Sequence, residues 1–352
     1  LMFEWRMKVA LIHIRYIYKG GLETRLFNYI NYFLKRGDEV HLFTSKISPD
    51  ITPPENLHIH MINLKHVLKP VRNFFFDKKL KYVLDRTAFD FILSLERTSQ
   101  QYHVVAPSTH KGYLVAKNRK FYDLIDLLQI CLDRKAFSSA KVVYACSKMI
   151  KDEIITYYKI PPNQIEVLYP PVNLSMFNFS LPKQEAQEKY KLDPKNKYFL
   201  FVSTSHKRKG LDLLLKVFKD LSENYVLIVA GTSFECDLHN VISLGFVKEM
   251  NDLYRAVDVL LHPAVYEPFG QIVSEAFACH LPVIVSNKVG AKELITAKNG
   301  LVVDSLQKED WIKAIEIILS KPFDFENMDK LLNELSLEKH MENMLNSALL
   351  RN

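Results

Sequence analysis

The sequence predicts an α/β protein built from two doubly wound, Rossmann-like domains that face a common cleft. Three observations support this class. The chain has 352 residues, 48% of them hydrophobic, enough to bury a large core in two domains. Short apolar, β-branched runs alternate with amphipathic stretches, which is typical of parallel sheets covered by helices. Because this alternation starts afresh near residue 198, it indicates two such domains.

The first series of elements begins with the apolar strand 7–14. Further strands are predicted at 39–44, 57–63, 90–95, 102–107, 141–145 and 165–169, with helices near 22–36, 74–86, 119–139 and 147–158. We assign residues 1–170 to an N-terminal domain and expect a helix near 330–352 to pack back on it. Residues 1–6 precede the first strand and are given no role.

The second series opens with the strand 198–203. Strands follow at 225–230, 241–247, 258–262 and 282–285, with helices near 210–221, 249–257 and 269–280. They form a C-terminal domain over residues 198–329. Residues 171–197 are polar and rich in proline, so we interpret them as the interdomain linker. In doubly wound domains, ligands bind outside the carboxyl ends of the strands.

Charge is divided unevenly along the chain. Residues 1–170 hold 26 Lys+Arg against 16 Asp+Glu, and residues 171–352 hold 21 against 24, which gives +10 and −3. A basic half suits phosphates, nucleic acid or an anionic membrane surface. Nucleic acid is not expected as a partner, since the basic residues are scattered and no recognised nucleic-acid motif appears. The widely spaced cysteines and the lack of a signal peptide or spanning segment favour a cytoplasmic protein.

Two glycines, Gly20 and Gly21, follow the first strand at a strand-to-helix turn. Glycine lets the backbone approach a ligand closely, and the start of the next helix attracts an anion such as a diphosphate. A Gly-Gly turn can equally be structural. Its spacing matches neither G-x-G-x-x-G nor the P-loop, so dinucleotide-binding and P-loop interpretations lose their main support.

A run of cations, Lys207-Arg208-Lys209, precedes Gly210 at the expected start of a helix. Cations oppose the helix dipole there, at a cost of roughly 0.3–1 kcal/mol each, unless an anion binds. We interpret the run as a phosphate site, with a solvated charge run as the alternative.

The strongest motif is HPAVYEPFGQIVSEA at residues 262–276. It combines the end of a buried strand, a Pro/Gly turn and a helix. Glu267 precedes the helix and Glu275 lies about two turns inside it, so both could face the strand ends. An acid on an apolar helical face is costly to bury without partners, and sugar and ribose hydroxyls would supply them.

The segment E-P-F-G-x-x-x-x-E-A, with the G-G turn and the K-G helix start, resembles the family 4 retaining glycosyltransferases of the GT-B fold. The resemblance runs from strand 7–14 to about Val303. Within the family, Arg208-Lys209-Gly210 and HPAVYE are most similar to bacterial lipopolysaccharide-core glucosyltransferases. The resemblance implies transfer of a hexose from a nucleoside diphosphate sugar, UDP-glucose at the family level, to a glycan or glycolipid acceptor. The N-terminal domain would bind the acceptor.

The resemblance also assigns roles to residues. Glu275 would bond the donor ribose and Glu267 the transferred hexose, while Arg208 and Lys209 would neutralise the diphosphate. Backbone groups of several further residues would contact the donor: Phe269, Gly270 and Gln271 at the sugar or diphosphate, Val247 at the base, and Gly20 and Gly21 over the phosphates.

Three residues are the catalytic candidates: Glu267, Lys209 and His110. His110 follows strand 102–107, at the position where many family members place an active-site histidine. One departure concerns Ser203, Thr204 and Ser205, which stand where many relatives have an arginine. Arg208 would then take over that charge.

No D-x-D motif is present, so transfer is expected to need no metal and no other cofactor. Arg208, Lys209 and helix N-termini would stabilise the leaving group instead. The resemblance implies retention of configuration, with the departing diphosphate accepting the acceptor's proton. Two alternatives stay open: a sugar-nucleotide epimerase of the same fold, and a non-catalytic sugar-nucleotide-binding protein.

Residues 111–122, KGYLVAKNRKFY, mix cations with aromatic and aliphatic side chains. This mixture suits the headgroup boundary of a bilayer. The segment therefore predicts peripheral binding to the anionic inner face of the cytoplasmic membrane, with a solvated loop over the acceptor cleft as the alternative.

Overall fold

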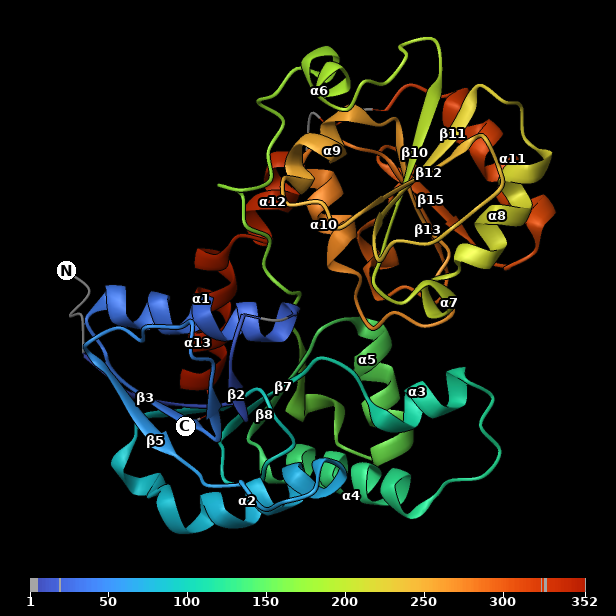
Figure 1. The fold of residues 1–352 in the computed structure, drawn as a ribbon. Helices are drawn as coiled ribbons and strands as arrows, with labels where there is room; N and C mark the ends of the chain where they lie inside the picture. Colours follow the sequence, from blue (N-terminus) through green and yellow to red (C-terminus); the bar gives the residue numbers. More distant parts are fainter. Residues whose placement is uncertain (1–5, 19, 324, 326–327, 352) are drawn as a thin grey trace. The chain divides into compact units, whose positions relative to one another are not determined.

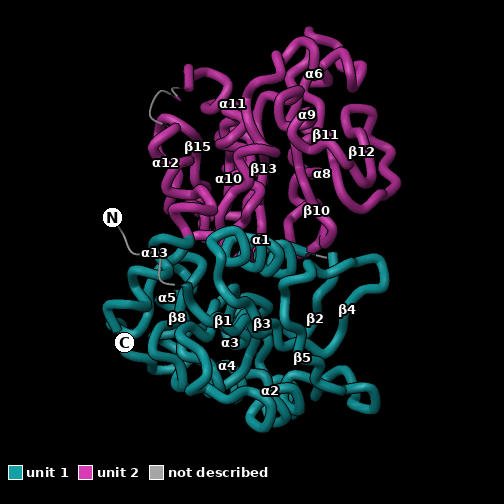
Figure 2. Tube along the Cα trace, turned by 90° about the vertical axis from the view of Figure 1, so that its left-hand side faces the viewer, with its two compact units in different colours: residues 1–168, 341–352 teal, residues 169–340 magenta. Residues whose placement is uncertain are grey.

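A computed structural model describes residues 6–18, 20–323, 325 and 328–351. The chain divides into two compact units, unit 1 (residues 1–168 and 341–352) and unit 2 (residues 169–340), which Figure 2 colours separately. Each unit is a parallel sheet with helices, so the predicted class of two doubly wound α/β domains is confirmed. No helix in the described residues is long and apolar enough to cross a membrane.

Unit 1 is built on a seven-stranded sheet in the order β5-β3-β1-β6-β7-β8-β9. Figure 1 labels strands β3, β5, β7 and β8 of this sheet. Every pair in it is parallel. The strands are β1 (Lys8–Ile12), β3 (Glu39–Thr44), β5 (Leu57–Met61), β6 (Phe91–Ser94), β7 (His103–Ala106), β8 (Val142–Ala145) and β9 (Ile165–Val167), with a separate short pair of β2 (Arg15–Tyr16) and β4 (Lys46–Ile47). The inner strands are buried on both faces, which explains their nearly continuous apolar sequences.

The first helices of unit 1 are α1 (Gly21–Arg36), α2 (Arg72–Val83), α3 (His110–Ala116), α4 (Leu124–Ser139) and α5 (Lys148–Glu153), which continues as a π-helical turn (Ile154–Tyr158). Side chains cap the last three, at Thr109, Asp123 and Ser147. The helix predicted over 119–139 begins only at Leu124, because Asp123 and Asp126 form a capping box there. Helix α3, capped by Thr109, was not predicted.

Unit 2 contains a six-stranded parallel sheet in the order β12-β11-β10-β13-β14-β15. Its strands are β10 (Lys197–Ser203), β11 (Tyr225–Gly231), β12 (Val241–Gly245), β13 (Val259–His262), β14 (Val283–Ser286) and β15 (Gly300–Val303). Its helices are α6 (Lys183–Lys189), α7 (His206–Lys209), α8 (Leu211–Asp220), α9 (Met250–Ala256), α10 (Gln271–Ala278), α11 (Lys308–Leu319) and α12 (Met328–Glu334).

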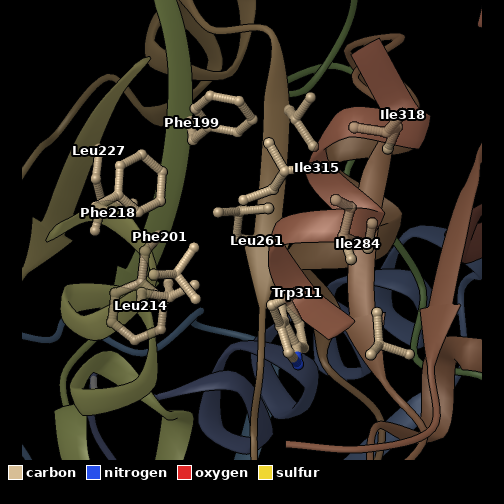
Figure 3. Close-up of a cluster of buried hydrophobic side chains, with 14 of the residues drawn as sticks. Phe199, Phe201, Leu214, Phe218, Leu227, Leu261, Ile284, Trp311, Ile315 and Ile318 are labelled. Atoms are coloured by element: carbon tan, nitrogen blue, oxygen red, sulfur yellow. The ribbon is translucent and has the colours of Figure 1, made fainter. Parts of the chain in front are cut away.

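The core of unit 2 lies between this sheet and helices α8 and α11 (Figure 3). Phe199 and Phe201 of β10 meet Leu214 and Phe218 of α8, and Trp311 of α11 is fully buried. Each fully buried side chain of this size contributes roughly 1.5–3 kcal/mol, so the core holds the strand ends in fixed positions.

Residues 171–197, predicted as the linker, belong to unit 2 and include α6. Lys189 of this helix pairs with Asp252 of α9, and Lys183 pairs with Asp258 at 2.7 Å. The chain passes between the units after Leu168 instead. It passes back within α13 (Leu337–Leu349), where the Tyr144 hydroxyl of unit 1 donates to the Met344 carbonyl at 2.9 Å.

Candidate functional site

The carboxyl edge of the sheet in unit 2 carries the residues predicted to bind the donor. Strands β10, β12 and β13 are parallel and end at Ser203, Gly245 and His262. The chain leaves this one edge in three segments, 204–210, 246–249 and 263–270. They contain, with the start of α10, the predicted residues Arg208, Lys209, Val247, Glu267, Phe269, Gly270, Gln271 and Glu275.

Two cations share one carboxylate at this edge. Arg208 Nη1 lies 3.2 Å from Glu267 Oε2 and donates to the Tyr266 carbonyl at 3.0 Å. Lys209 Nζ lies 3.8 Å from the same carboxylate oxygen, and both side chains are 16% exposed. Arg208 and Lys209 thus bring two positive charges to one point of this edge, which suits an anionic ligand.

Gly210 lets the cationic segment approach the strand that precedes Glu267. It adopts a left-handed conformation with φ of 89° between α7 and α8. A Cβ at this position would lie 2.2 Å from the Pro263 carbonyl oxygen, and Val265 N–H donates to the Arg208 carbonyl at 3.1 Å. The predicted helix 210–221 therefore begins at Leu211, and the three cations lie in the separate one-turn helix α7.

Glu275 lies on α10 close to the same cluster. The Tyr254 hydroxyl donates to Glu275 Oε2 at 2.8 Å, and no hydrogen bond from the described residues reaches Oε1. Burial raises the pKa of Glu275 and lowers the pKa of Lys209, while their mutual attraction and the charge of Glu267 act in the opposite direction. These opposed shifts mark a desolvated site, where electrostatic interactions with a ligand are stronger than in water.

His262 ends β13 behind this cluster and had no role in our sequence interpretation. Its ring is fully buried, 3.8 Å from Glu267 Oε2, and its nitrogens have no hydrogen-bond partner in the described residues. Burial, then the charges of Lys209 and Arg208, hold its pKa well below the usual value, so the ring is neutral. Gly270 has a φ of 94°, and a Cβ added to it would lie 3.5 Å from Nε2 of this ring.

Three predicted donor residues lie at the same edge but outside the charged cluster. Phe269 is buried, and its ring stacks on Tyr169 with 5.8 Å between centroids. The Gln271 amide donates to the Pro171 carbonyl at 3.4 Å. Val247 follows β12 after Phe246, whose side chain is exposed. Their contacts with a donor remain predictions.

In unit 1, His110 is held by a network of acids that the sequence did not reveal. Its Nε2 pairs with Asp126 Oδ1 at 3.0 Å, and its backbone N–H donates to Asp133 Oδ2 at 2.7 Å. Asp133 also accepts hydrogen bonds from Arg97 and from the Tyr158 hydroxyl. An imidazole oriented by a carboxylate suits proton transfer. The same pair also has a structural role, because it joins the start of α3 to α4.

Gly20 and Gly21 begin α1 as predicted, with Gly20 at φ of 91°. The start of this helix already holds a carboxylate, because a Cβ on Gly20 would lie 3.1 Å from Glu23 Oε2. Arg15 pairs with the other oxygen of Glu23 at 2.9 Å. A phosphate at this helix start would therefore meet an acid that is already neutralised by Arg15.

A small cavity lies at the carboxyl ends of β6 and β7. Glu96, Arg97, Pro107 and Asp133 are among its lining residues. Glu96 is also 2.8 Å from Nδ1 of His13, which follows β1 and is buried. The cavity thus has charged walls at the edge where a doubly wound unit binds its ligand.

Two sequence families match the chain. The family described as Glycosyltransferase Family 4 matches residues 19–176, and the one described as Glycosyl transferases group 1 matches residues 182–335. A probable transglycosylase of Burkholderia thailandensis is 27% identical over 287 residues, which cover 81% of this chain and 79% of that protein. Other curated relatives are matched over about half of their length.

Solved structures share the fold over nearly the whole chain. WaaG, a glycosyltransferase involved in lipopolysaccharide biosynthesis, superimposes with a TM-score of 0.75 at 19% identity, over 95% of this chain and 94% of that one. HepE from Anabaena, solved in complex with UDP and glucose, has a TM-score of 0.72 at 14% identity, over 97% and 99% of the two chains.

Proposed function

This chain belongs to the family 4 glycosyltransferases of the GT-B fold, and from that premise we propose that it transfers a hexose from a nucleoside diphosphate sugar to a glycan or glycolipid acceptor. The observation that carries the proposal is the cluster of Arg208, Lys209 and Glu267 beside Glu275. UDP-glucose is the proposed donor, since HepE was solved with UDP and glucose.

The donor would replace the internal ion pairs of this cluster. Arg208 and Lys209 turn toward Glu267, and a diphosphate would offer them more negative charge than one carboxylate does. Glu267 would then be released to accept hydrogen bonds from the hexose. Glu275, whose Oε1 accepts no hydrogen bond from the described residues, would accept one from the ribose.

We propose retention of configuration without a metal ion. Charge on the departing diphosphate would be stabilised by Arg208, Lys209 and the first N–H groups of α10, which have no partner within the helix. The acceptor hydroxyl would attack the face that the diphosphate leaves and pass its proton to the diphosphate. Neutral His262 would add no third positive charge beside Glu267, Arg208 and Lys209.

The acceptor would bind at the carboxyl edge of unit 1, where His110 and the cavity beside Arg97 and Asp133 lie. A lipopolysaccharide-core acceptor is the specific proposal, supported by the resemblance in the HPAVYE segment and by the function given for WaaG. His110, oriented by Asp126, is the proposed residue for contact with the acceptor hydroxyl.

A donor panel with product analysis tests the proposal. Purified protein is incubated with UDP- and GDP-hexoses and truncated lipopolysaccharide cores, and products are resolved by mass spectrometry and anomeric NMR. A hexose joined to the acceptor with retained configuration is expected. Epimerised sugar nucleotide without acceptor would establish the epimerase instead, and donor binding without any product would establish the non-catalytic alternative.

Exposed apolar side chains support the peripheral membrane association proposed for residues 111–122. Phe121 and Leu124 are 86% and 84% exposed, and Ile125 and Leu127 are also exposed. Arg119 pairs with both Asp123 and Asp126, so the basic charge of the segment is smaller than the sequence indicates. Burying the two most exposed side chains in lipid would contribute roughly 1.5–3 kcal/mol each.

Vesicle co-sedimentation tests this association. Binding to anionic vesicles is expected, with a marked loss in a Phe121→Ser/Leu124→Ser variant. Tyr82→Ser, which changes an 80% exposed side chain on α2, is the matched control and should bind like the parent. Protein that stays in the supernatant with anionic vesicles at low salt would refute the membrane proposal alone.

A further inference from the structure

Four side chains with metal-binding atoms gather on one face of β3 and β5 in unit 1. Glu39 and His41 alternate on β3, and His58 and His60 alternate on β5. The two strands are parallel neighbours, with His41 directly opposite His58 and β5 at the edge of the sheet. Because alternate residues of a strand share a face, this register places all four side chains on the same side.

The contacts within the group are short. His41 Nε2 lies 2.8 Å from Glu39 Oε1, and His41 Nδ1 lies 2.8 Å from His60 Nε2. The rings of His41 and His58 stack with 4.6 Å between centroids. One ligand atom each from Glu39, His41 and His58 lies within 4.8 Å of the others. No other such trio of His, Cys, Asp or Glu occurs in the described part of the chain.

The protein encloses this group on one side only. His41 is buried and meets the Phe89 ring edge-on, with 5.0 Å between centroids. His58 is exposed, so one side of the group stays open to solvent.

We propose that Glu39, His41 and His58 form a binding site for a divalent transition-metal ion such as Zn²⁺. Imidazole and carboxylate ligands suit this class of ion, at distances of about 2.0–2.2 Å in a tetrahedral site. The ligand atoms would have to approach one another from their present separations, and the exposed His58 side chain can move. The ion would take the place of the proton between His41 Nε2 and Glu39. That proton would move to Nδ1 of the neutral ring, and water would complete the coordination.

His60 is a positioning residue in this site. With the ion bound, Nε2 of His60, 2.8 Å from His41 Nδ1, would accept a hydrogen bond from Nδ1–H and so keep Nε2 of His41 available for the ion. Lys8 Nζ, 3.0 Å from Glu39 Oε1, is the competing partner of the carboxylate. The site lies toward the amino ends of β3 and β5, away from the carboxyl edge that carries the proposed transfer chemistry, and the ion would tie the edge strand to its neighbour.

Isothermal titration of untagged, EDTA-treated and dialysed full-length protein with ZnCl₂ tests the site. One equivalent is expected to bind, with a rise in melting temperature that MgCl₂ does not produce. His41→Ala and His58→Ala should each weaken binding at least tenfold, and His60→Phe roughly 10- to 100-fold. Since His58 is exposed, its variant keeps the test valid even if the His41 variant folds poorly.

His239→Ala is the matched control, because this histidine is exposed in unit 2 and should leave zinc binding unchanged. Absence of stoichiometric binding in the parent would overturn the proposal. Zinc binding that is equally tight in the His41 and His58 variants would also overturn it. Neither outcome depends on whether the protein transfers sugar, which the donor panel decides separately.

Discussion

At the scale of single residues, replacement of Lys209 or Glu275 is the most direct test of the donor site. Replacing either by Ala removes a hydrogen bond to a charged group, worth about 1.5–3 kcal/mol. We therefore expect kcat/KM for transfer to fall by at least roughly tenfold to 150-fold. Lys207→Ala is the control, since Lys207 is an exposed neighbour in the same short helix. If a folded Lys209 or Glu275 variant transferred sugar at the wild-type rate, that residue would not be part of the donor site.

His103 of β7 gives a prediction about acid stability. Burial lowers its pKa from 6.5 to about 4. The unfolded chain takes up this proton as pH falls below about 6.5, whereas the folded chain resists until about 4, so folding is progressively destabilised across that window, by roughly 3 kcal/mol in total. In the His103→Phe variant, the free energy of unfolding should fall less steeply between about pH 6.5 and 4.

Urea unfolding followed by circular dichroism at pH 7, 5.5 and 4.5 measures the effect of His103. The slopes of parent and variant are compared, because His41, His60 and His262 also have lowered pKa values and remain in both proteins. The exposed His239→Ala variant should keep the parental slope. An unchanged slope in His103→Phe would contradict the prediction.

At the scale of elements, two glycines with the same φ allow the effect of backbone strain on stability to be compared with the effect of close packing. Gly210 joins α7 to α8 and Gly37 ends α1, both at φ of 89°. A Cβ on Gly37 meets nothing within 4 Å, whereas one on Gly210 would lie 2.2 Å from a backbone oxygen. Gly37→Ala should therefore lower the free energy of unfolding by about 1–2 kcal/mol, the strain of a left-handed alanine. Gly210→Ala should lower it clearly more, because its Cβ also clashes with the backbone.

Two measurements check this pair: the free energy of unfolding in urea, and the affinity for UDP by titration calorimetry. Gly210→Ala should also weaken UDP binding, because α7 and its cations would be displaced from Glu267. Gly37→Ala should bind UDP like the parent. Equal losses of stability in the two variants would show that the approach of α7 to Pro263 is not tight.

The elements also show how far sequence reasoning reaches. The strands could be predicted because inner parallel strands are apolar on both faces, as in Tyr198–Ser203. Helix α6 was missed because prolines mark the segment as a linker, and its contacts with α9 arise only in the folded unit. The motifs assigned Arg208 and Glu267 to one donor site, but the ion pair between them was not predicted. The pair of His110 with Asp126 and the facing of His41 and His58 depend on helix packing and strand register, which spacing alone does not reveal.

At the scale of the whole molecule, transfer should continue when divalent ions are removed. The observations behind this prediction are the cations Arg208 and Lys209 at the donor edge and the absence of a D-x-D motif. Initial rates are measured before and after EDTA treatment, and little change is expected. Complete loss of turnover that Mg²⁺ or Mn²⁺ restores would show that a metal stabilises the leaving group. Removal of zinc from the β3–β5 site should lower only the melting temperature.

The return of the chain into unit 1 through α13 has a consequence for how the protein is made. Unit 2 is continuous in sequence, whereas unit 1 is completed by residues from Met341 onward. A ribosome therefore begins unit 1 first and supplies its last helix only after all of unit 2. Until then the buried Tyr144 hydroxyl lacks its acceptor at Met344, and the face that α13 covers stays open. We therefore expect nascent unit 1 to expose this face, and to be open to aggregation there, until α13 has been made.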